Sequence, residues 1–242
     1  MQLSIVKNVG LLVLAVVGIA SRADAGIITV PPGLAPGSQY RLAFFTTDDF
    51  NAESSTISDY NTMVTTEANA VAALAALSTT WFDIGSTESV SAITNIGIDS
   101  GVPIYDLEGH RIAADAGTDA GGLFSGTLGT SIDFDPTGAY PTVWVLTGSN
   151  TSGTQAAIHE LGAGFITEVG ITENDNPGEW IAADSEVEHH LARLYGISGV
   201  LTVSVSSVPE PATTGMVLAG GALMFCARRR IHRNRRATRP LC

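Results

Sequence analysis

The sequence predicts a β-rich α+β domain, because short strand-like segments outnumber long helical patterns. Residues 40–46, 142–147 and 200–205 each alternate between two sets of side chains, which is the pattern of a strand. Residues 57–77 carry an apolar stripe at helical spacing and are expected to form the main helix. Glycine and polar residues separate most of the remaining apolar pieces. The domain is therefore expected to open and close with a strand and to contain one main helix.

The opening strand has the sequence YRLAFFT. Its two faces alternate along the chain, with Tyr40, Leu42 and Phe44 on one face and Arg41, Ala43 and Phe45 on the other. Because large apolar residues occur on both faces, we expect both to be at least partly buried. Residues 102–107 also resemble a strand, and a tight turn at 107–110 leads into a returning segment at 111–113.

The main helix is expected to begin at Thr56, which can cap it, with Asp59 three residues later. Apolar residues then recur every three or four positions to about Leu77, namely Ile57, Tyr60, Val64, Ala68, Val71 and Leu74. This stripe predicts packing against the domain core. Trp81 follows directly and is expected to cover the helix end.

A second, shorter helix is predicted over residues 185–196. Ser185 and Glu188 have the spacing of a capping box at its start, and Gly196 is placed to end it. Its apolar stripe would consist of Val187, Leu191 and Leu194.

Residues 1–25 have the organisation of a secretory signal peptide. Lys7 supplies an early positive charge, and residues 9–20 form an apolar core. Ala23 and Ala25 fit the small-x-small cleavage pattern, which predicts a mature start at Gly26. The alternative is an uncleaved anchor helix, for which the apolar core is short.

The C-terminal region combines three features in a fixed order. Pro209, Glu210 and Pro211 come first, an apolar run at 212–227 follows, and the basic cluster Arg228, Arg229 and Arg230 closes it. An apolar run followed by arginines predicts a transmembrane helix with its basic end in the cytoplasm. The run is shorter than the roughly 20 residues that usually span a bilayer, and flanking arginines can make up part of the difference. A tail at 237–242 follows.

This region, residues 208–236, closely resembles the PEP-CTERM sorting signal of bacteria. The resemblance implies export by Sec-type machinery with signal peptidase, and then processing at Pro209–Pro211 by an exosortase-type membrane protease. The protein would be membrane-anchored transiently and then reach the cell surface or the extracellular space. Proteins of this kind are associated with exopolysaccharide and biofilm. The alternative is an ordinary C-terminal membrane anchor.

The exported body, residues 26–207, is strongly acidic. The chain has 12 basic residues, of which nine lie in the two ends, so only Arg41, Arg111 and Arg193 remain in the body. Two of the 24 acidic residues lie outside it, so 22 remain and the net charge is near −19. Such a surface repels nucleic acid and anionic polymers and attracts cations. The acidic surface is consistent with binding of a divalent cation, and equally with a surface that only keeps an exported protein soluble.

The best candidate site in the body is the loop at 173–179. Its oxygen-bearing side chains are Glu173, Asn174, Asp175, Asn176 and Glu179, which suit calcium. The alternative is a solvated turn anchored by Trp180. Both cysteines, Cys226 and Cys242, lie outside the body, so no disulfide can stabilise it.

No complete catalytic motif is present, so the sequence predicts no catalytic residue. His159 and Glu160 begin like a zinc-protease helix, but the second histidine would stand at position 163, which is Ala163. A Gly-x-Ser-x-Gly elbow and a phosphate-binding loop are also lacking from the sequence.

The order of segments weakly resembles a C-type lectin-like domain. The residues that carry the resemblance are the opening strand, the helix ending near Trp81, the segment TVWVLTG, the loop ENDNPGEW and the closing strand VLTVSV. It implies that the terminal strands pair and that the loop at 173–179 holds calcium, with sugar hydroxyls completing the coordination shell. The usual disulfides and Glu-Pro-Asn order of that family are absent. A plain β-sandwich is the alternative fold.

Two functions remain open at this point. The first is a non-catalytic, exported cell-surface or extracellular-matrix protein that binds exopolysaccharide with calcium. The second is a secreted hydrolase acting on polysaccharide or peptide, with paired carboxylates drawn from the acidic residues.

Overall fold

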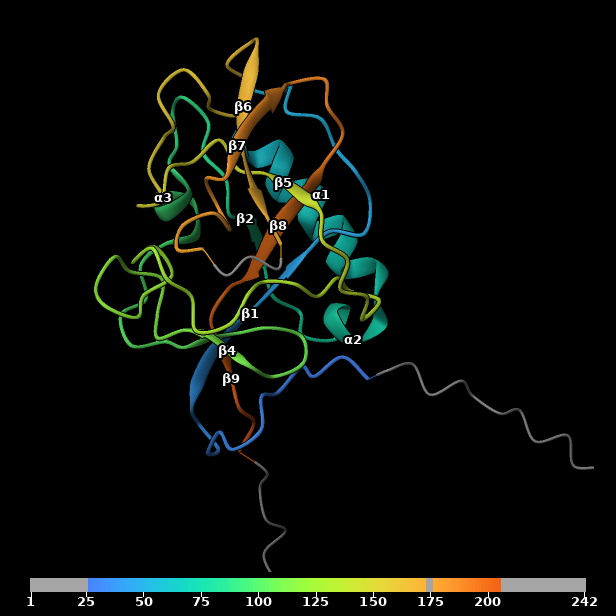
Figure 1. Cartoon of the computed structure of the whole chain (residues 1–242). Helices are drawn as coiled ribbons and strands as arrows, with labels where there is room; N and C mark the ends of the chain where they lie inside the picture. The colour runs from blue at the N-terminus through green and yellow to red at the C-terminus, as the bar shows by residue number, and fades with distance from the viewer. Residues whose placement is uncertain (1–25, 173–175, 206–242) are drawn as a thin grey trace, which may run out of the picture.

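A computed structural model describes residues 26–172 and 176–205 (Figure 1). Its centre is β1 (Gln39–Phe45), which pairs antiparallel with β8 (Arg193–Ser198). The other elements are α1 (Ile57–Ala70), α2 (Ala72–Ala75), β2 (Trp81–Asp83), α3 (Ala92–Ile96), β3 (Ile104–Tyr105), β4 (Arg111–Ala113), β5 (Trp144–Leu146), β6 (Ile166–Ile171), β7 (Asp184–Val187) and β9 (Leu201–Thr202). The fold is therefore β-rich α+β, as predicted.

The described strands form one hydrogen-bonded sheet in the order β4-β3-β1-β8-β5-β6-β7, with β2 added to β8 and β9 added to β1. β1 and β3 run parallel, as do β8 and β5, while the other neighbouring pairs are antiparallel. The strands predicted at 102–107, 111–113 and 142–147 correspond to β3, β4 and β5. In the described residues the sheet is continuous, rather than divided into the two sheets of a sandwich.

The first and last strands pair, as the lectin-like resemblance implied. Tyr40 lies opposite Leu201, and at the other end of β1 Phe45 lies opposite Tyr195. The register shifts by one residue between these pairs, so the chain has a bulge at residues 199–200, between β8 and β9. The pairing extends one step further, because the backbone N–H of Val203 donates to the carbonyl of Ser38 at 2.9 Å.

Both faces of β1 are buried, again as predicted. Leu42 and Phe44 lie in a core with α1 and α2, whose buried residues are Tyr60, Val64, Ala68 and Leu74. Ala43 and Phe45 lie in a second core on the other face, which α3 and the long loops cover. The molecule is thus layered, with α1 and α2 on one side of the central strands and α3 with the long loops on the other (Figure 1).

The predicted main helix is present but interrupted. It begins after Thr56, whose hydroxyl makes no capping hydrogen bond, and it breaks at Val71, where the backbone is extended. Trp81 lies in β2 and is completely buried, and its ring meets the edge of Phe44 at a centroid distance of 5.2 Å. It thus belongs to the same core as the helix stripe.

The helix predicted over 185–196 is wrong. This segment contains β7, a turn and most of β8. β8 is buried along both faces between β1 and β5, so long-range pairing overrides the local helical spacing. Gly196 does not end a helix. It allows close contact, because a Cβ there would lie 2.8 Å from the Phe44 ring.

In the part of the chain that the structure describes, no helix has the length and hydropathy to cross a membrane. The predicted transmembrane helix at 212–227 lies outside these residues, as do the sorting-signal residues and the tail. The same holds for the signal peptide with Ala23 and Ala25, while Gly26 is the first described residue and is exposed.

Candidate functional site

A long loop between β4 and β5 forms the outer layer of the molecule. Residues 114–143 contain no helix or strand, yet backbone hydrogen bonds fix their path. Ala114 N–H donates to Gly121 O at 2.7 Å, and Leu123 N–H donates to Asp115 O at 2.8 Å. Leu123 is completely buried in the core on this side of the sheet. The loop is thus held in place by its backbone hydrogen bonds and by packing against the core, and a recess lined by it has a fixed shape.

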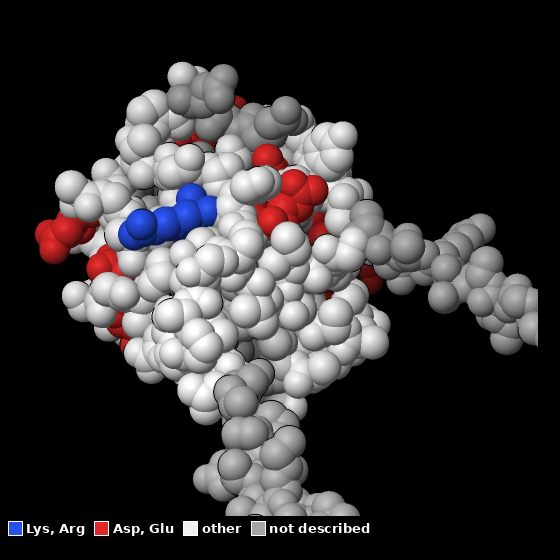
Figure 2. All heavy atoms as spheres, turned by 90° about the horizontal axis from the view of Figure 1, so that it is seen from below, with Lys and Arg blue, Asp and Glu red and all other residues white. Residues whose placement is uncertain are grey.

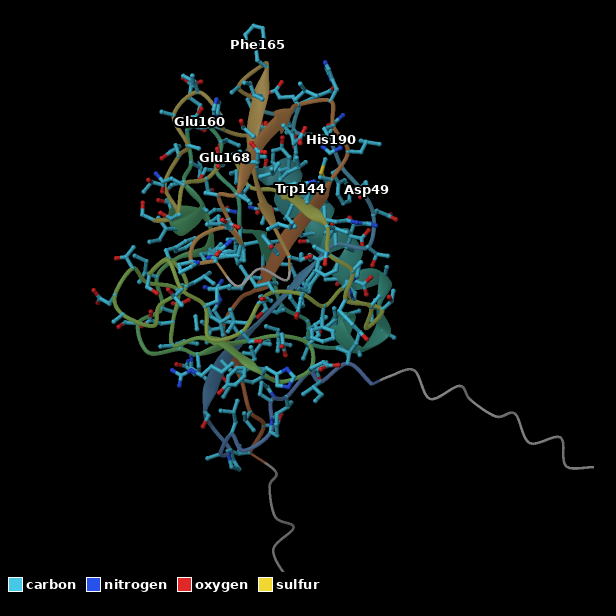
Figure 3. All side chains as sticks on the ribbon, viewed as in Figure 1. Asp49, Trp144, Glu160, Phe165, Glu168 and His190 are labelled. Carbon is cyan, nitrogen blue, oxygen red and sulfur yellow. The ribbon has the colours of Figure 1, made fainter. Side chains whose placement is uncertain are left out.

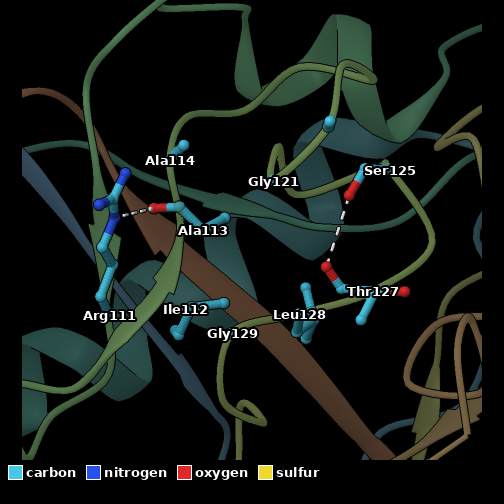
Figure 4. A pocket seen from close by; sticks show the side chains of 10 residues that line it. Arg111, Ile112, Ala113, Ala114, Gly121, Ser125, Thr127, Leu128 and Gly129 are labelled. Carbon is cyan, nitrogen blue, oxygen red and sulfur yellow. Dashed lines mark hydrogen bonds between the residues drawn. The ribbon is translucent and has the colours of Figure 1, made fainter.

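The first recess has a volume of about 640 Å³ and lies between β4 and this loop (Figure 4). Its wall consists of Arg111, Ile112, Ala113, Ala114, Ala120, Gly121, Ser125, Thr127, Leu128 and Gly129. The Ser125 hydroxyl donates to Gly122 O at 2.7 Å and lies 3.4 Å from Thr127 O. The wall therefore combines small apolar groups, two hydroxyls and one guanidinium, which is a mixture suited to a polar ligand.

A second recess of about 330 Å³ adjoins the first, because both are lined by residues 127–129. It is also lined by Thr130, Ser131 and residues 176–178, and by Trp180. Hydroxyl and amide groups therefore surround this recess. The end of the predicted calcium loop forms one side of it.

Trp180 anchors this end of the loop. It is 4% exposed, and its ring packs against Phe124 and Tyr195 at centroid distances of 6.1 and 5.8 Å. The indole N–H has no acceptor among the described residues. Buried Trp side chains usually pair this group, so the unpaired indole N–H is an exception among the buried polar groups of the described residues.

Asn176 and Glu179 are the two predicted calcium ligands that the structure describes. The amide of Asn176 donates to a carboxylate oxygen of Glu179 at 3.0 Å, so the two side chains lie together. Glu173, Asn174 and Asp175 lie outside the described residues. Within the described ranges no group of three or more His, Cys, Asp and Glu side chains is arranged to hold a metal ion. Calcium at this loop therefore stays a prediction.

The three basic residues of the body differ in their surroundings. Arg41 is buried, donates to Ser198 O at 2.6 Å and lies 3.4 Å from Asp99. Arg193 lies 3.0 Å from Asp49. Desolvation lowers the pKa of Arg41, and the charge of Asp99 partly offsets this. Arg111, in contrast, is exposed at the mouth of the first recess.

Sequence reasoning missed a histidine–carboxylate pair between the 156–165 loop and β6. His159 Nδ1 lies 3.6 Å from a carboxylate oxygen of Glu168. His159, but not Glu168, lines a recess of about 560 Å³ together with Glu160 and Phe165. Burial raises the pKa of Glu168, and His159 partly opposes this shift. Figure 3 shows Glu160 and Glu168 at this end of the molecule, with Phe165 at its far tip. The zinc motif had drawn attention to His159, but only its spatial pairing with β6 reveals Glu168.

One comparison with known proteins bears on the C-terminal end. A family model described as the PEP-CTERM protein-sorting motif matches residues 207–230. No curated protein matches the chain. The motif covers the Pro-Glu-Pro triplet, the apolar run and the first arginines that the sequence singled out. The chain therefore carries the sorting signal of an exported, exosortase-processed protein, which passes through a membrane-anchored stage on its way to the cell surface.

Proposed function

We propose that this chain is a non-catalytic cell-surface or extracellular-matrix protein that binds exopolysaccharide with the help of calcium. The observation that carries the proposal is the match to the PEP-CTERM motif at residues 207–230, which directs the body to the cell exterior. The adjoining recesses on the loop layer support it further, since their hydroxyl and amide groups suit sugar hydroxyls.

The finer proposal for the fold is a C-type lectin-like domain. The pairing of β1 with β9 supports it, as do the placement of α1 and α2 directly after the first strand and the long loops gathered on the opposite side of the sheet. In that family a loop of this kind holds calcium, and the ion in turn binds the sugar. The loop here would use Glu173, Asn174, Asp175, Asn176 and Glu179. Their oxygen atoms are the ligands that calcium prefers.

The test measures retention on exopolysaccharide with calcium and with a chelator. We expect retention only with calcium. Glu179→Gln should weaken calcium binding about tenfold or more, because one anionic ligand is lost. Glu108→Gln removes an exposed carboxylate at the turn between β3 and β4 and serves as the matched control. Retention that is unchanged by chelator and by Glu179→Gln would contradict the role of calcium.

Processing of the C-terminal region has a separate test. Protein recovered from the cell exterior should lack residues 212–236, and the intact mass measures this directly. A mature protein that retains Arg228, Arg229 and Arg230 would instead favour an ordinary membrane anchor.

A secreted hydrolase is the second candidate, and the pair of His159 and Glu168 favours it. A carboxyl group with a raised pKa, paired with a histidine that lines a recess, can act as a general acid or base. On this alternative the protein cleaves a polysaccharide or peptide, and Glu168→Gln abolishes cleavage. Cleavage of a substrate panel without binding of exopolysaccharide would establish this function in place of the first.

A further inference from the structure

Arg111 stands out electrostatically among the described residues. The body has 22 acidic residues and three basic ones. Two of the three basic residues, Arg41 and Arg193, lie beside carboxylates. Within residues 26–172 and 176–205 no carboxylate lies within ion-pair distance of Arg111, although it is exposed. In so acidic a body, a solvent-accessible arginine without a partner calls for an explanation in terms of something that binds to it.

Its position is fixed by β4. The Nε–H of Arg111 donates to Ala113 O at 3.3 Å (Figure 4). This hydrogen bond holds the side chain against the β4 backbone. No other hydrogen bond engages its guanidinium in the described part of the chain. The two terminal nitrogens therefore keep their donors, and they do so at the wall of the 640 Å³ recess.

We propose that the first recess binds an acidic sugar, with the uronate carboxylate paired to Arg111. This inference rests on the proposed function and narrows its ligand from exopolysaccharide in general to a polymer with uronate units. The planar guanidinium matches a carboxylate in a paired, charge-assisted geometry. Ser125 and Thr127 supply hydroxyls on the opposite wall for the sugar ring, and the adjoining second recess offers room for the next unit.

The overall negative charge of the body does not prevent this. Charges on an exposed surface are screened beyond about 8 Å at physiological salt, so the nearest group dominates at the recess. Seen from below, the molecule carries basic atoms in one patch, with acidic groups on either side and uncharged atoms over most of that face (Figure 2). The nearby guanidinium therefore favours the one uronate carboxylate that enters the recess, while carboxylates elsewhere on the polymer stay in screened solvent.

The experiment uses the full chain in detergent and two probes, trigalacturonate and its methyl ester, each with calcium and with a chelator. The ester has the same ring and lacks the charge. We expect the acid to bind about tenfold more tightly than the ester. Arg111→Gln should remove this preference and leave binding of the ester unchanged. Arg193→Gln removes one charge of the same sign elsewhere and is the matched control.

The outcomes separate the two proposals. Equal binding of acid and ester overturns the uronate inference and leaves exopolysaccharide binding intact. Equal loss in Arg111→Gln and Arg193→Gln also overturns it, because net charge would then explain the preference. Binding of neither trigalacturonate probe overturns the uronate inference, while retention on whole exopolysaccharide still tests the proposed function by itself. Far-ultraviolet circular dichroism of both variants confirms that the fold is retained.

Discussion

Asp83 should make the stability of the body fall as pH rises. It is completely buried in β2, and neither carboxyl oxygen has a hydrogen-bond partner among the described residues. Its backbone is fully held, because the N–H donates to Asn61 and the carbonyl accepts from Asn95, each at 2.8 Å. The side chain therefore cannot escape to solvent without breaking β2. Burial raises the pKa of Asp83 well above its ordinary value.

Proton linkage gives the sign and the size of this change in the free energy of unfolding with pH. Below an ordinary carboxyl pKa of about 3.9, folded and unfolded states both hold the proton, so the stabilising contribution is complete. Above it only the unfolded state releases the proton, and the free energy of unfolding falls by about 1.4 kcal/mol per pH unit. The fall ends once pH exceeds the raised pKa of the folded state. Asp83→Asn keeps the shape and removes this proton.

The assay is chemical denaturation of both proteins at several values between about pH 4 and about pH 7. The advantage of Asp83→Asn over the wild type should grow by about 1.4 kcal/mol per unit across the titration window. Subtracting the free energy of unfolding of the wild type from that of the variant at each pH removes the contribution of the other carboxylates, which both proteins share. Parallel stability curves would refute the reasoning, since they would mean that Asp83 ionises alike in both states. An equal effect from Asp119→Asn, which removes an exposed carboxylate, would show that net charge alone is responsible.

Two further substitutions probe the packing around the central strands. Gly85→Ala should lower the free energy of unfolding by about 1–3 kcal/mol, because the added Cβ would lie 2.2 Å from an Asp83 oxygen. The penalty should shrink in an Asp83→Ala background, and an unchanged penalty would contradict the clash. Arg41→Met should cost about 1–3 kcal/mol in denaturation, since Ser198 O loses its donor and Asp99 its cation. Wild-type stability in this variant would show that water replaces the guanidinium.

The sequence was most informative where local pattern and tertiary environment agree. The alternation of Tyr40 to Phe45 predicted a strand buried on both faces, and β1 lies between two cores. The stripe from Tyr60 to Leu74 predicted one main helix on one of those cores, and the structure divides it into α1 and α2 at Val71. In both cases the spacing of the apolar side chains along the chain matches the face that they bury. The local pattern was therefore enough to predict these elements without knowing which distant segment packs against them.

The segment at 185–196 shows why the rest could not be predicted. Val187, Leu191 and Leu194 repeat at helical intervals, yet Leu194 pairs in a strand with Leu146, far away in the chain. The same limit applies to the candidate site. Arg111 and Thr127 belong to one recess only because the loop folds back on β4, and its glycines and short polar side chains give no periodic signal of that path.

The pairing of β9 with β1 has a consequence for the order of events during export. Because Leu201 and Thr202 complete the edge of a strand that begins at Gln39, the sheet cannot close until nearly the whole body has been synthesised and translocated. The sorting motif begins at residue 207, only a few residues later. Only four residues separate the end of β9 from the start of the sorting motif, so the last strand of the sheet and the sorting signal leave the export machinery almost together.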